Sequence, residues 1–144
     1  MYVKKKILSF ISLTKKHILI INKALTVTRI IFGVLITIFG ANKFFNFMPV
    51  PEEMPEAVMN YMTALISTKT LQLVGAVEVL AGLSFIFNKY GALMAIILMS
   101  VSINAVLFQL FLGPADITGA LILLILNIVM LYAYRDKYKD LIAG

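Results

Sequence analysis

The fold is decided by residues 70–112, TLQLVGAVEVLAGLSFIFNKYGALMAIILMSVSINAVLFQLFL. Two continuously apolar runs, residues 70–87 and 91–112, are separated only by the short turn Asn88-Lys89-Tyr90. Each run is close to the roughly 20 residues that a helix needs to cross the hydrocarbon core of a bilayer. Because the runs lack the period-two alternation of barrel strands, they predict two antiparallel membrane-spanning helices.

Two further apolar runs, residues 24–45 and 117–134, flank this pair and predict two more spans. Residues typical of turns separate the runs: Pro49, Pro51, Pro55, Gly113 and Pro114. Between the first two spans, residues 56–67 have an apolar face but are too short to cross a bilayer, so we interpret them as an interfacial helix. The predicted fold class is therefore all-α, an integral membrane four-helix bundle with a short interfacial helix between spans 1 and 2.

The composition of the whole chain agrees with lipid as the solvent. The chain has 144 residues, of which 61% are hydrophobic and 14% charged, whereas a soluble domain is about half apolar and a quarter charged. This length leaves no room for a separate soluble catalytic domain. Zero cysteines and one histidine exclude dithiol chemistry, thiolate-bound iron–sulfur clusters and bis-histidine haem within one chain, and we see no catalytic constellation or metal site. We therefore expect a non-enzymatic membrane protein.

The placement of lysine and arginine predicts the orientation in the membrane. With four spans both termini lie on one side, and that side carries eleven basic residues against two, Lys43 and Lys69, on the other. We expect a multi-pass protein of the cytoplasmic (inner) membrane with both termini in the cytoplasm. A net charge of +6 does not indicate nucleic-acid binding here, because the positive charges cluster at the ends of apolar spans. The eleven residues are Lys4, Lys5, Lys6, Lys15, Lys16, Lys23, Arg29, Lys89, Arg135, Lys137 and Lys139.

The chain divides into three parts by composition. Residues 1–23 begin like a signal peptide, but Lys15-Lys16 follows the short apolar run with no small-residue cleavage site. We expect a retained basic N-terminal arm at the inner membrane surface. Residues 24–140 form the four-span domain, and residues 141–144 form a C-terminal tail.

Besides the uncharged Gln109 of the third span, five polar residues stand out within or at the ends of the predicted spans. Ionisable groups in spans are costly, face the interior and find partners there. Arg29 and Lys43 lie near the two ends of the first span, Glu78 lies inside the second, and Asn104 and Asn127 lie in the third and fourth. A rise of roughly 1.5 Å per residue places the last three at similar depth. The spacing therefore predicts a buried polar cluster or ligand site made of these five residues.

The spacing leaves alternatives open for each of these residues. Glu78 paired with Lys43 or Arg29 would hold two helices in register, whereas a ligand or proton site would use the same carboxylate for function. A desolvated Glu78 without a partner would be protonated. Instead of contacting a ligand, Asn104 and Asn127 would form hydrogen bonds between helices, which contribute about 0.6 kcal/mol each. Small residues beside the charges predict close helix packing, and these are Gly33, Gly40, Gly75 and Gly82.

In their order and spacing these features resemble the DoxX family of small bacterial membrane proteins. The resemblance covers about residues 24–140. It is carried by Arg29 leading into Gly33, by Gly40-Ala41-Asn42-Lys43-Phe44, by the Pro- and Glu-containing segment 48–56, by the Gly-x-x-Glu-x-x-x-Gly pattern of residues 75–82, by Val101-Ser102-Ile103-Asn104 and by the tyrosine-ended fourth span. It implies a four-helix integral membrane protein. Some relatives are subunits of a thiosulfate–quinone oxidoreductase and others are associated with membrane redox-stress complexes.

These observations favour a non-catalytic module that binds a membrane or inner-leaflet redox protein and a small lipophilic ligand such as a quinone. In this hypothesis Lys43 and Glu78 contact the polar head of the ligand, while Gly40 and Gly82 leave space for its ring. One alternative is proton or solute transport through a site centred on Glu78. The other is a membrane subunit of a quinone-linked oxidoreductase, whose electron carrier would come from another chain. The oligomeric state stays open.

Overall fold

The structure, a computed structural model, describes residues 2–49, 53–113 and 117–142, and all regular secondary structure in these ranges is helical. The predicted turn residues Pro51 and Pro114 lie outside these ranges. The elements are α1 (Tyr2–Phe45), α2 (Glu56–Ser67), α3 (Thr70–Phe87), α4 (Gly91–Phe111), α5 (Ile117–Ala133), the 3-10 helix η2 (Arg135–Tyr138) and α6 (Lys139–Ile142). The all-α fold class is confirmed.

Three of these helices, α1, α3 and α4, are long and apolar enough to cross a membrane. The fourth predicted span, α5, is apolar but has 17 residues, ending at Ala133 rather than Tyr134. The prediction of four full-length spans is therefore off by this one helix among the described residues. Its last turn changes into η2, because the chain has to leave the helix axis to place Tyr134 and Tyr138 against the α3–α4 turn.

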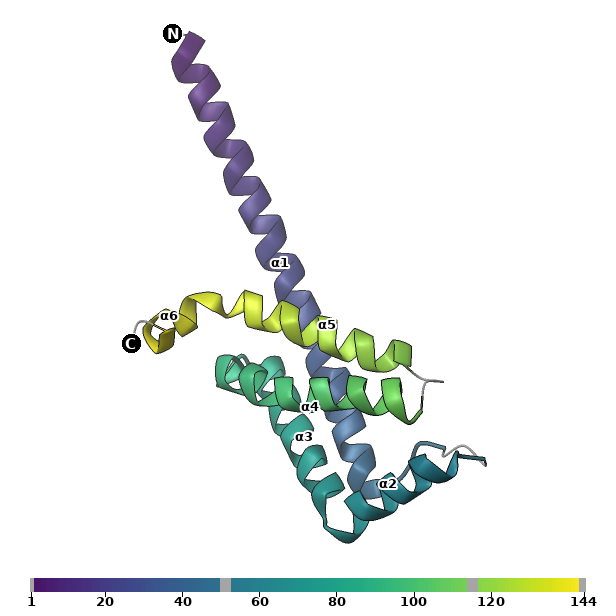
Figure 1. The fold of residues 1–144 in the computed structure, drawn as a ribbon. Helices are drawn as coiled ribbons and strands as arrows, with labels where there is room; N and C mark the ends of the chain where they lie inside the picture. Colours follow the sequence, from purple (N-terminus) through teal and green to yellow (C-terminus); the bar gives the residue numbers. More distant parts are fainter. Residues whose placement is uncertain (1, 50–52, 114–116, 143–144) are drawn as a thin grey trace.

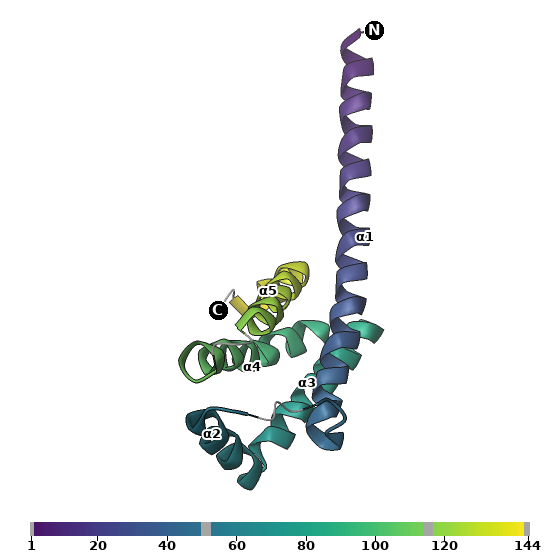
Figure 2. The same ribbon diagram turned by 90° about the vertical axis from the view of Figure 1, so that its right-hand side faces the viewer.

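Two helix pairs make up the body of the fold. The end of α1 packs along α3, and α5 packs along α4, with far less contact between α1 and α5. Figures 1 and 2 show that α3 and α4 meet at their common turn and diverge away from it, so the two pairs cross rather than run side by side. The predicted bundle therefore consists of two crossed helix pairs. Helix α2 lies beside the open end of the V that α3 and α4 form (Figure 2).

The turn between α3 and α4 has the geometry that its residues favour. Asn88 and Tyr90 both adopt left-handed backbone conformations, with φ of 55° and 59°, and asparagine tolerates this conformation better than most residues. The Asn88 side chain also accepts a hydrogen bond from the Tyr134 hydroxyl (3.0 Å), and the Ala92 carbonyl accepts one from the Tyr138 hydroxyl (2.8 Å). The end of α5 is therefore fastened to this turn.

The packed core lies where the two pairs cross. Phe32 of α1 stacks on Phe85 of α3 with ring centroids 5.5 Å apart, and Leu98 of α4 and Met130 of α5 are fully buried beside them. Few side chains of α1 before this point are covered: every residue from Lys5 to Ala24 is exposed. The boundary expected at residue 23 is therefore a change in composition and packing, but α1 itself continues through it without a break (Figure 1).

Glycines bring α1 and α3 into backbone contact. A Cβ added to Gly40 would lie 2.8 Å from the Gly75 carbonyl oxygen, and one added to Gly33 would lie 2.8 Å from the Gly82 carbonyl oxygen. Real Cβ atoms do not approach other atoms this closely, so no larger residue fits at either crossing without moving a helix. The close packing predicted from the small residues beside the charges is confirmed.

Candidate functional site

An ion pair joins α1 and α3 immediately beside one of these glycine contacts. The Lys43 ammonium lies 2.5 Å from the Glu78 carboxylate, and the side chains are 23% and 6% exposed, respectively. A Cβ on Gly40 would lie 2.9 Å from the Glu78 Cβ, and one on Gly75 would lie 3.0 Å from the Lys43 Cβ. Because Gly40 and Gly75 have no side chain, the two backbones approach closely enough for the ammonium and the carboxylate to meet.

This geometry decides which of the two basic residues pairs with Glu78. The ammonium of Lys43, in the last turn of α1, also lies 3.5 Å from the Phe39 carbonyl oxygen. The Arg29 guanidinium lies at the other end of the α1–α3 contact and donates to the carbonyls of Phe85 and Ile86. These carbonyls lie in the last turn of α3, so Arg29 caps the C-terminal end of that helix and its positive charge complements the helix dipole.

The two asparagines also lie apart from the ion pair. The buried Asn127 amide hydrogen-bonds the Ser102 hydroxyl (3.2 Å) and so joins α5 to α4. Asn104 is exposed on α4, where its side-chain oxygen accepts a hydrogen bond from the Tyr61 hydroxyl of α2 (3.2 Å). The structure therefore does not bring the five predicted residues together. Lys43 and Glu78 meet, Arg29 joins the same two helices at the opposite end of their contact, and Asn104 and Asn127 join other helix pairs.

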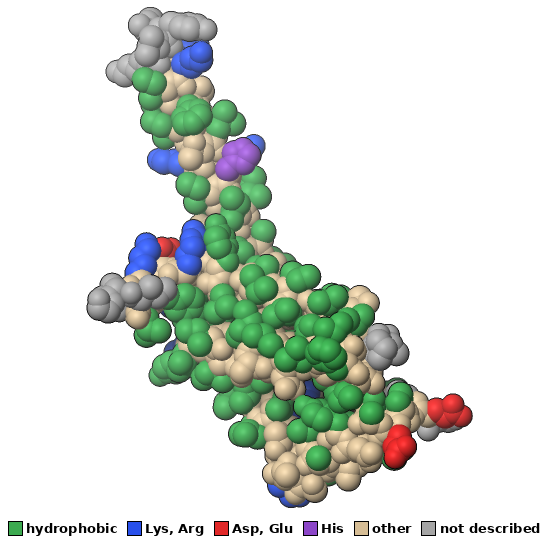
Figure 3. Space-filling model, in the orientation of Figure 1, with side chains coloured by type: hydrophobic (Ala, Val, Ile, Leu, Met, Phe, Trp, Pro, Cys, Tyr) green, Lys and Arg blue, Asp and Glu red, His purple; other side chains and the backbone are tan. Residues whose placement is uncertain are grey.

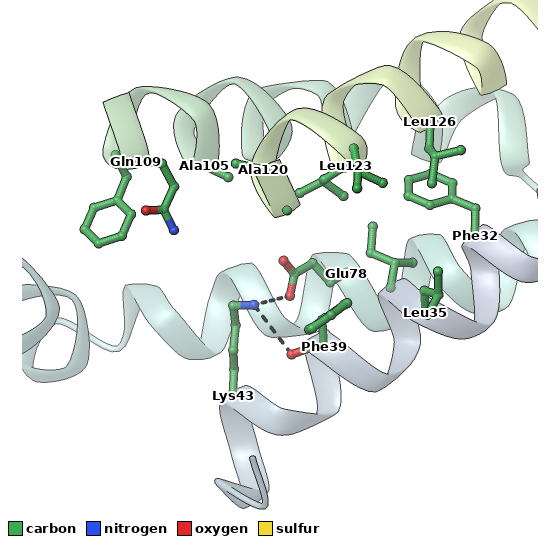
Figure 4. A pocket seen from close by; sticks show the side chains of 14 residues that line it. Phe32, Leu35, Phe39, Lys43, Glu78, Ala105, Gln109, Ala120, Leu123 and Leu126 are labelled. Atoms are coloured by element: carbon green, nitrogen blue, oxygen red, sulfur yellow. Dashed lines mark hydrogen bonds and ion pairs between the residues drawn. The ribbon is translucent and has the colours of Figure 1, made fainter. Parts of the chain in front are cut away.

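A cavity of about 470 Å³ lies between the two helix pairs, with the ion pair in its wall. Figure 4 shows Lys43 and Glu78 on one side of this space and the α4–α5 pair on the other. Leu35, Phe39 and Ile122 line the cavity and are also exposed, so it is continuous with the apolar outer surface of the protein. The lining residues are Phe32, Leu35, Ile36, Phe39, Lys43, Glu78, Ala105, Phe108, Gln109, Gly119, Ala120, Ile122, Leu123 and Leu126.

Gln109 is a lining residue that was not among the five predicted site residues. It extends from α4 toward the same space as the ion pair (Figure 4). Helical periodicity places it on one face of α4 with Leu98, Ser102 and Ala105, which follow a 4-3-4 spacing, but does not say that this face is the buried one. Leu98 and Ser102 are buried on that face, whereas Asn104 lies off it and is exposed.

The chemistry of the cavity is that of a site for an amphiphile. A pocket that is mainly apolar and carries a few polar groups at one end orients a ligand by its polar head. Lys43 supplies a charged donor, Glu78 a carboxylate, and Gln109 an amide that both donates and accepts. Among the described residues, no group of three or more His, Asp or Glu side chains lies close enough to hold a metal ion.

Comparison with known proteins gives a match to one protein family, over the segment that contains α3, nearly all of α4 and the packed part of α1. The family model DoxX matches residues 24–110, which include α2, α3, nearly all of α4 and the part of α1 that packs on α3. No curated protein and no solved structure matches the chain.

Proposed function

Since this chain belongs to the DoxX family of membrane proteins, we propose that it is a non-catalytic membrane module that holds a small lipophilic molecule, such as a quinone, between its helix pairs and docks a membrane or inner-leaflet redox protein. The observation that carries the ligand part is the Lys43–Glu78 pair in the wall of an apolar cavity. An ion pair kept only to join two helices needs no space beside it. Here Glu78 is one of the residues that line the cavity, so a bound head group can reach its carboxylate.

The residues around the cavity fit a ring with a polar oxygen at its edge. Lys43 donates to Glu78 at 2.5 Å and has further N–H groups that can donate to a carbonyl or hydroxyl oxygen of the ligand. Gln109 provides a second polar contact from α4, and the Phe39 and Phe108 rings supply flat apolar surface. A bound quinone would contribute reversible electron and proton uptake. The residues of this chain would hold it, exclude water and neutralise its polar head.

Entry from the bilayer also fits this arrangement. Because Phe39 and Ile122 both line the cavity and face outward, a lipophilic molecule dissolved in the bilayer reaches the cavity without crossing water. This favours the binding of a membrane-dissolved molecule over transport of a polar solute.

Binding is tested with decylubiquinone as the probe and the purified protein in detergent micelles. The readout is the rise in the midpoint of thermal unfolding with increasing probe, because a molecule that binds only the folded state stabilises it. Ala105→Phe fills part of the cavity from α4 and keeps both members of the ion pair, and Ala24→Phe adds the same side chain at an exposed position of α1 as the matched control. We expect the rise for the native protein and for Ala24→Phe, and its loss for Ala105→Phe.

Glu78→Gln separates a ligand role from a purely architectural one. The amide oxygen can still accept from Lys43, so folding should stay nearly intact while the probe-induced stabilisation decreases. A variant that is merely less stable but responds fully to the probe would make the ion pair architectural. Glu78-dependent proton flux into liposomes would instead favour transport, and co-purification with a chromophore-bearing chain would favour an oxidoreductase subunit.

The orientation of the chain is a second part of the proposal. Both termini and the α3–α4 turn face the cytoplasm of the inner membrane, as the excess of basic residues on that side favours. Because the sequence has no cysteine, single cysteines report the topology directly. A membrane-impermeant maleimide added to intact spheroplasts should label Thr68→Cys, between α2 and α3, and leave Lys89→Cys unlabelled until the membrane is opened. The reverse labelling would contradict this orientation.

A further inference from the structure

The N-terminal half of α1 packs against no other helix among the described residues, and every side chain from Lys5 to Ala24 is exposed. Figures 1 and 2 show it projecting away from both helix pairs. Its apolar side chains are nonetheless large and exposed, with Phe10 71%, Leu8 59% and Leu19 61% exposed. A helix with this much apolar surface is not stable in water on its own, so another phase or molecule has to cover it.

A stripe of large apolar side chains and a stripe of lysines lie on opposite faces of this segment, residues 5–23, hereafter the arm, while Leu8, Leu19, Ile20, Lys6 and Lys15 lie at the sides between them. Successive residues of a helix are 100° apart, which places Ile7, Phe10, Ile11, Ile18 and Ile21 within one stripe. Opposite this stripe lie Lys5, Ser12, Lys16 and Lys23, spaced by seven, four and seven residues. Figure 3 shows both kinds of side chain exposed along the arm.

The charge of the arm has one sign. Residues 1–23 contain six lysines, and the first acidic residue of the whole sequence is Glu52. The basic residues Lys89, Arg135 and Lys137, near the end of the helix pairs from which the arm emerges, are exposed as well. A surface that complements both the apolar stripe and the lysines must be apolar in its interior and negatively charged at its boundary.

We propose that the arm lies along the surface of an anionic lipid bilayer, with the stripe around Phe10, Ile18 and Ile21 in the acyl region and Lys5, Lys16 and Lys23 among the phosphate groups. This inference is independent of the cavity and its ligand. Lying on the surface requires α1 to bend where the arm meets the packed part. At this junction the Thr26 hydroxyl donates to the Asn22 carbonyl four residues earlier (2.9 Å), a local bond that favours helix bending.

Two other occupants fit the arm less well. A second copy of the chain would pair two arms that each carry five lysines and no acidic residue, so the two arms would repel each other. Insertion across the bilayer would place Lys15 and Lys16, in the middle of the arm, within the hydrocarbon core. The lipid surface complements both the lysines and the apolar stripe.

The test uses the full chain reconstituted in phosphatidylcholine vesicles with or without phosphatidylglycerol. Phe10→Cys lies in the apolar stripe and Ser12→Cys on the lysine face, and a nitroxide on each reports collisions with oxygen, which dissolves in lipid, and with a water-soluble nickel chelate. In phosphatidylglycerol vesicles we expect the Phe10 label to favour oxygen and the Ser12 label to favour nickel. A label at Ile125→Cys, exposed on α5, should be unaffected by the lipid composition.

Removing charge from the arm should abolish the difference between the two labels in their accessibility to oxygen and to the nickel chelate. Each lysine near an anionic surface strengthens binding about fivefold, so Lys5→Gln, Lys6→Gln, Lys15→Gln and Lys16→Gln together should weaken it by several hundred-fold, on the order of the product of four such factors. Loss of the contrast in this variant and in pure phosphatidylcholine supports the proposal. Equal nickel access at both positions in every vesicle, equal oxygen access at both, or short distances between Phe10 labels of neighbouring copies would overturn it.

Discussion

Separating Lys43 from Glu78 should destabilise the protein unequally, depending on which partner is removed. Lys43→Met leaves Glu78, whose side chain is 6% exposed, without its partner, and either the uncompensated buried charge or the protonation that removes it costs about 3–5 kcal/mol. Glu78→Leu leaves an ammonium that is 23% exposed at the end of α1. That long side chain can extend to the membrane interface, so the cost should be about 1–2 kcal/mol.

The double variant Lys43→Met/Glu78→Leu removes both charges and should be the informative case. Replacing a buried ion pair by apolar side chains of similar volume is often nearly neutral, so we expect a loss of about 1 kcal/mol, far below the sum of the single losses. The measurement is reversible unfolding by sodium dodecyl sulfate in mixed micelles, followed by far-ultraviolet circular dichroism. A double loss equal to the sum of the single losses within about 0.5 kcal/mol, or equal losses for the two single variants, would refute this reasoning.

Three further predictions concern packing, the α3–α4 turn and the C-terminal end. Gly40→Ala should lower the free energy of unfolding by about 1–3 kcal/mol through overpacking against α3, whereas Gly119→Ala, exposed on α5, should not lower it; both are measured in the same micelles. Tyr134→Phe should cost about 1 kcal/mol, because the hydrogen bond to the turn is lost. The hydrogen bond from Lys139 holds the pKa of the Asp136 carboxyl below its usual value. Its small contribution to stability is therefore present above the unfolded-state pKa and lost as the pH falls through the folded-state value, and carbon-13 NMR should show this pKa rising in Lys139→Gln.

Much of the fold follows from local sequence. The apolar runs and the short turn at residues 88–90 predict helices whose bounds the structure places within a few residues of those expected, except that α1 begins at Tyr2 rather than near residue 24. Gly33, Gly40, Gly75 and Gly82 predict the close α1–α3 contact, because only small residues permit it. The length of α5 and the continuity of α1 through residue 23 could not be predicted from the sequence, because hydropathy marks the ends of apolar runs and not the ends of helices.

The site was predicted only in part. Glu78 and one basic partner follow from the rule that charges inside a membrane protein find one another, but spacing along α1 allowed either Lys43 or Arg29. Asn104 and Asn127 lie at a similar predicted depth to Glu78 yet face other helices, because depth along a span says nothing about rotation around it. Gln109 was passed over for the same reason, although its face of α4 carries the buried Leu98 and Ser102.

The sequence by itself determined the solvent, the helices and the points where two of them can touch, because these depend on composition, run length and the size of single residues. Only the tertiary structure decided that the helices form two crossed pairs, that Lys43 rather than Arg29 meets Glu78, and that a cavity of about 470 Å³ lies beside them. The physical reason is that lipid tails are as apolar as the side chains of the protein interior. In a bilayer the outward and inward faces of a helix therefore look alike in sequence, and packing alone distinguishes them.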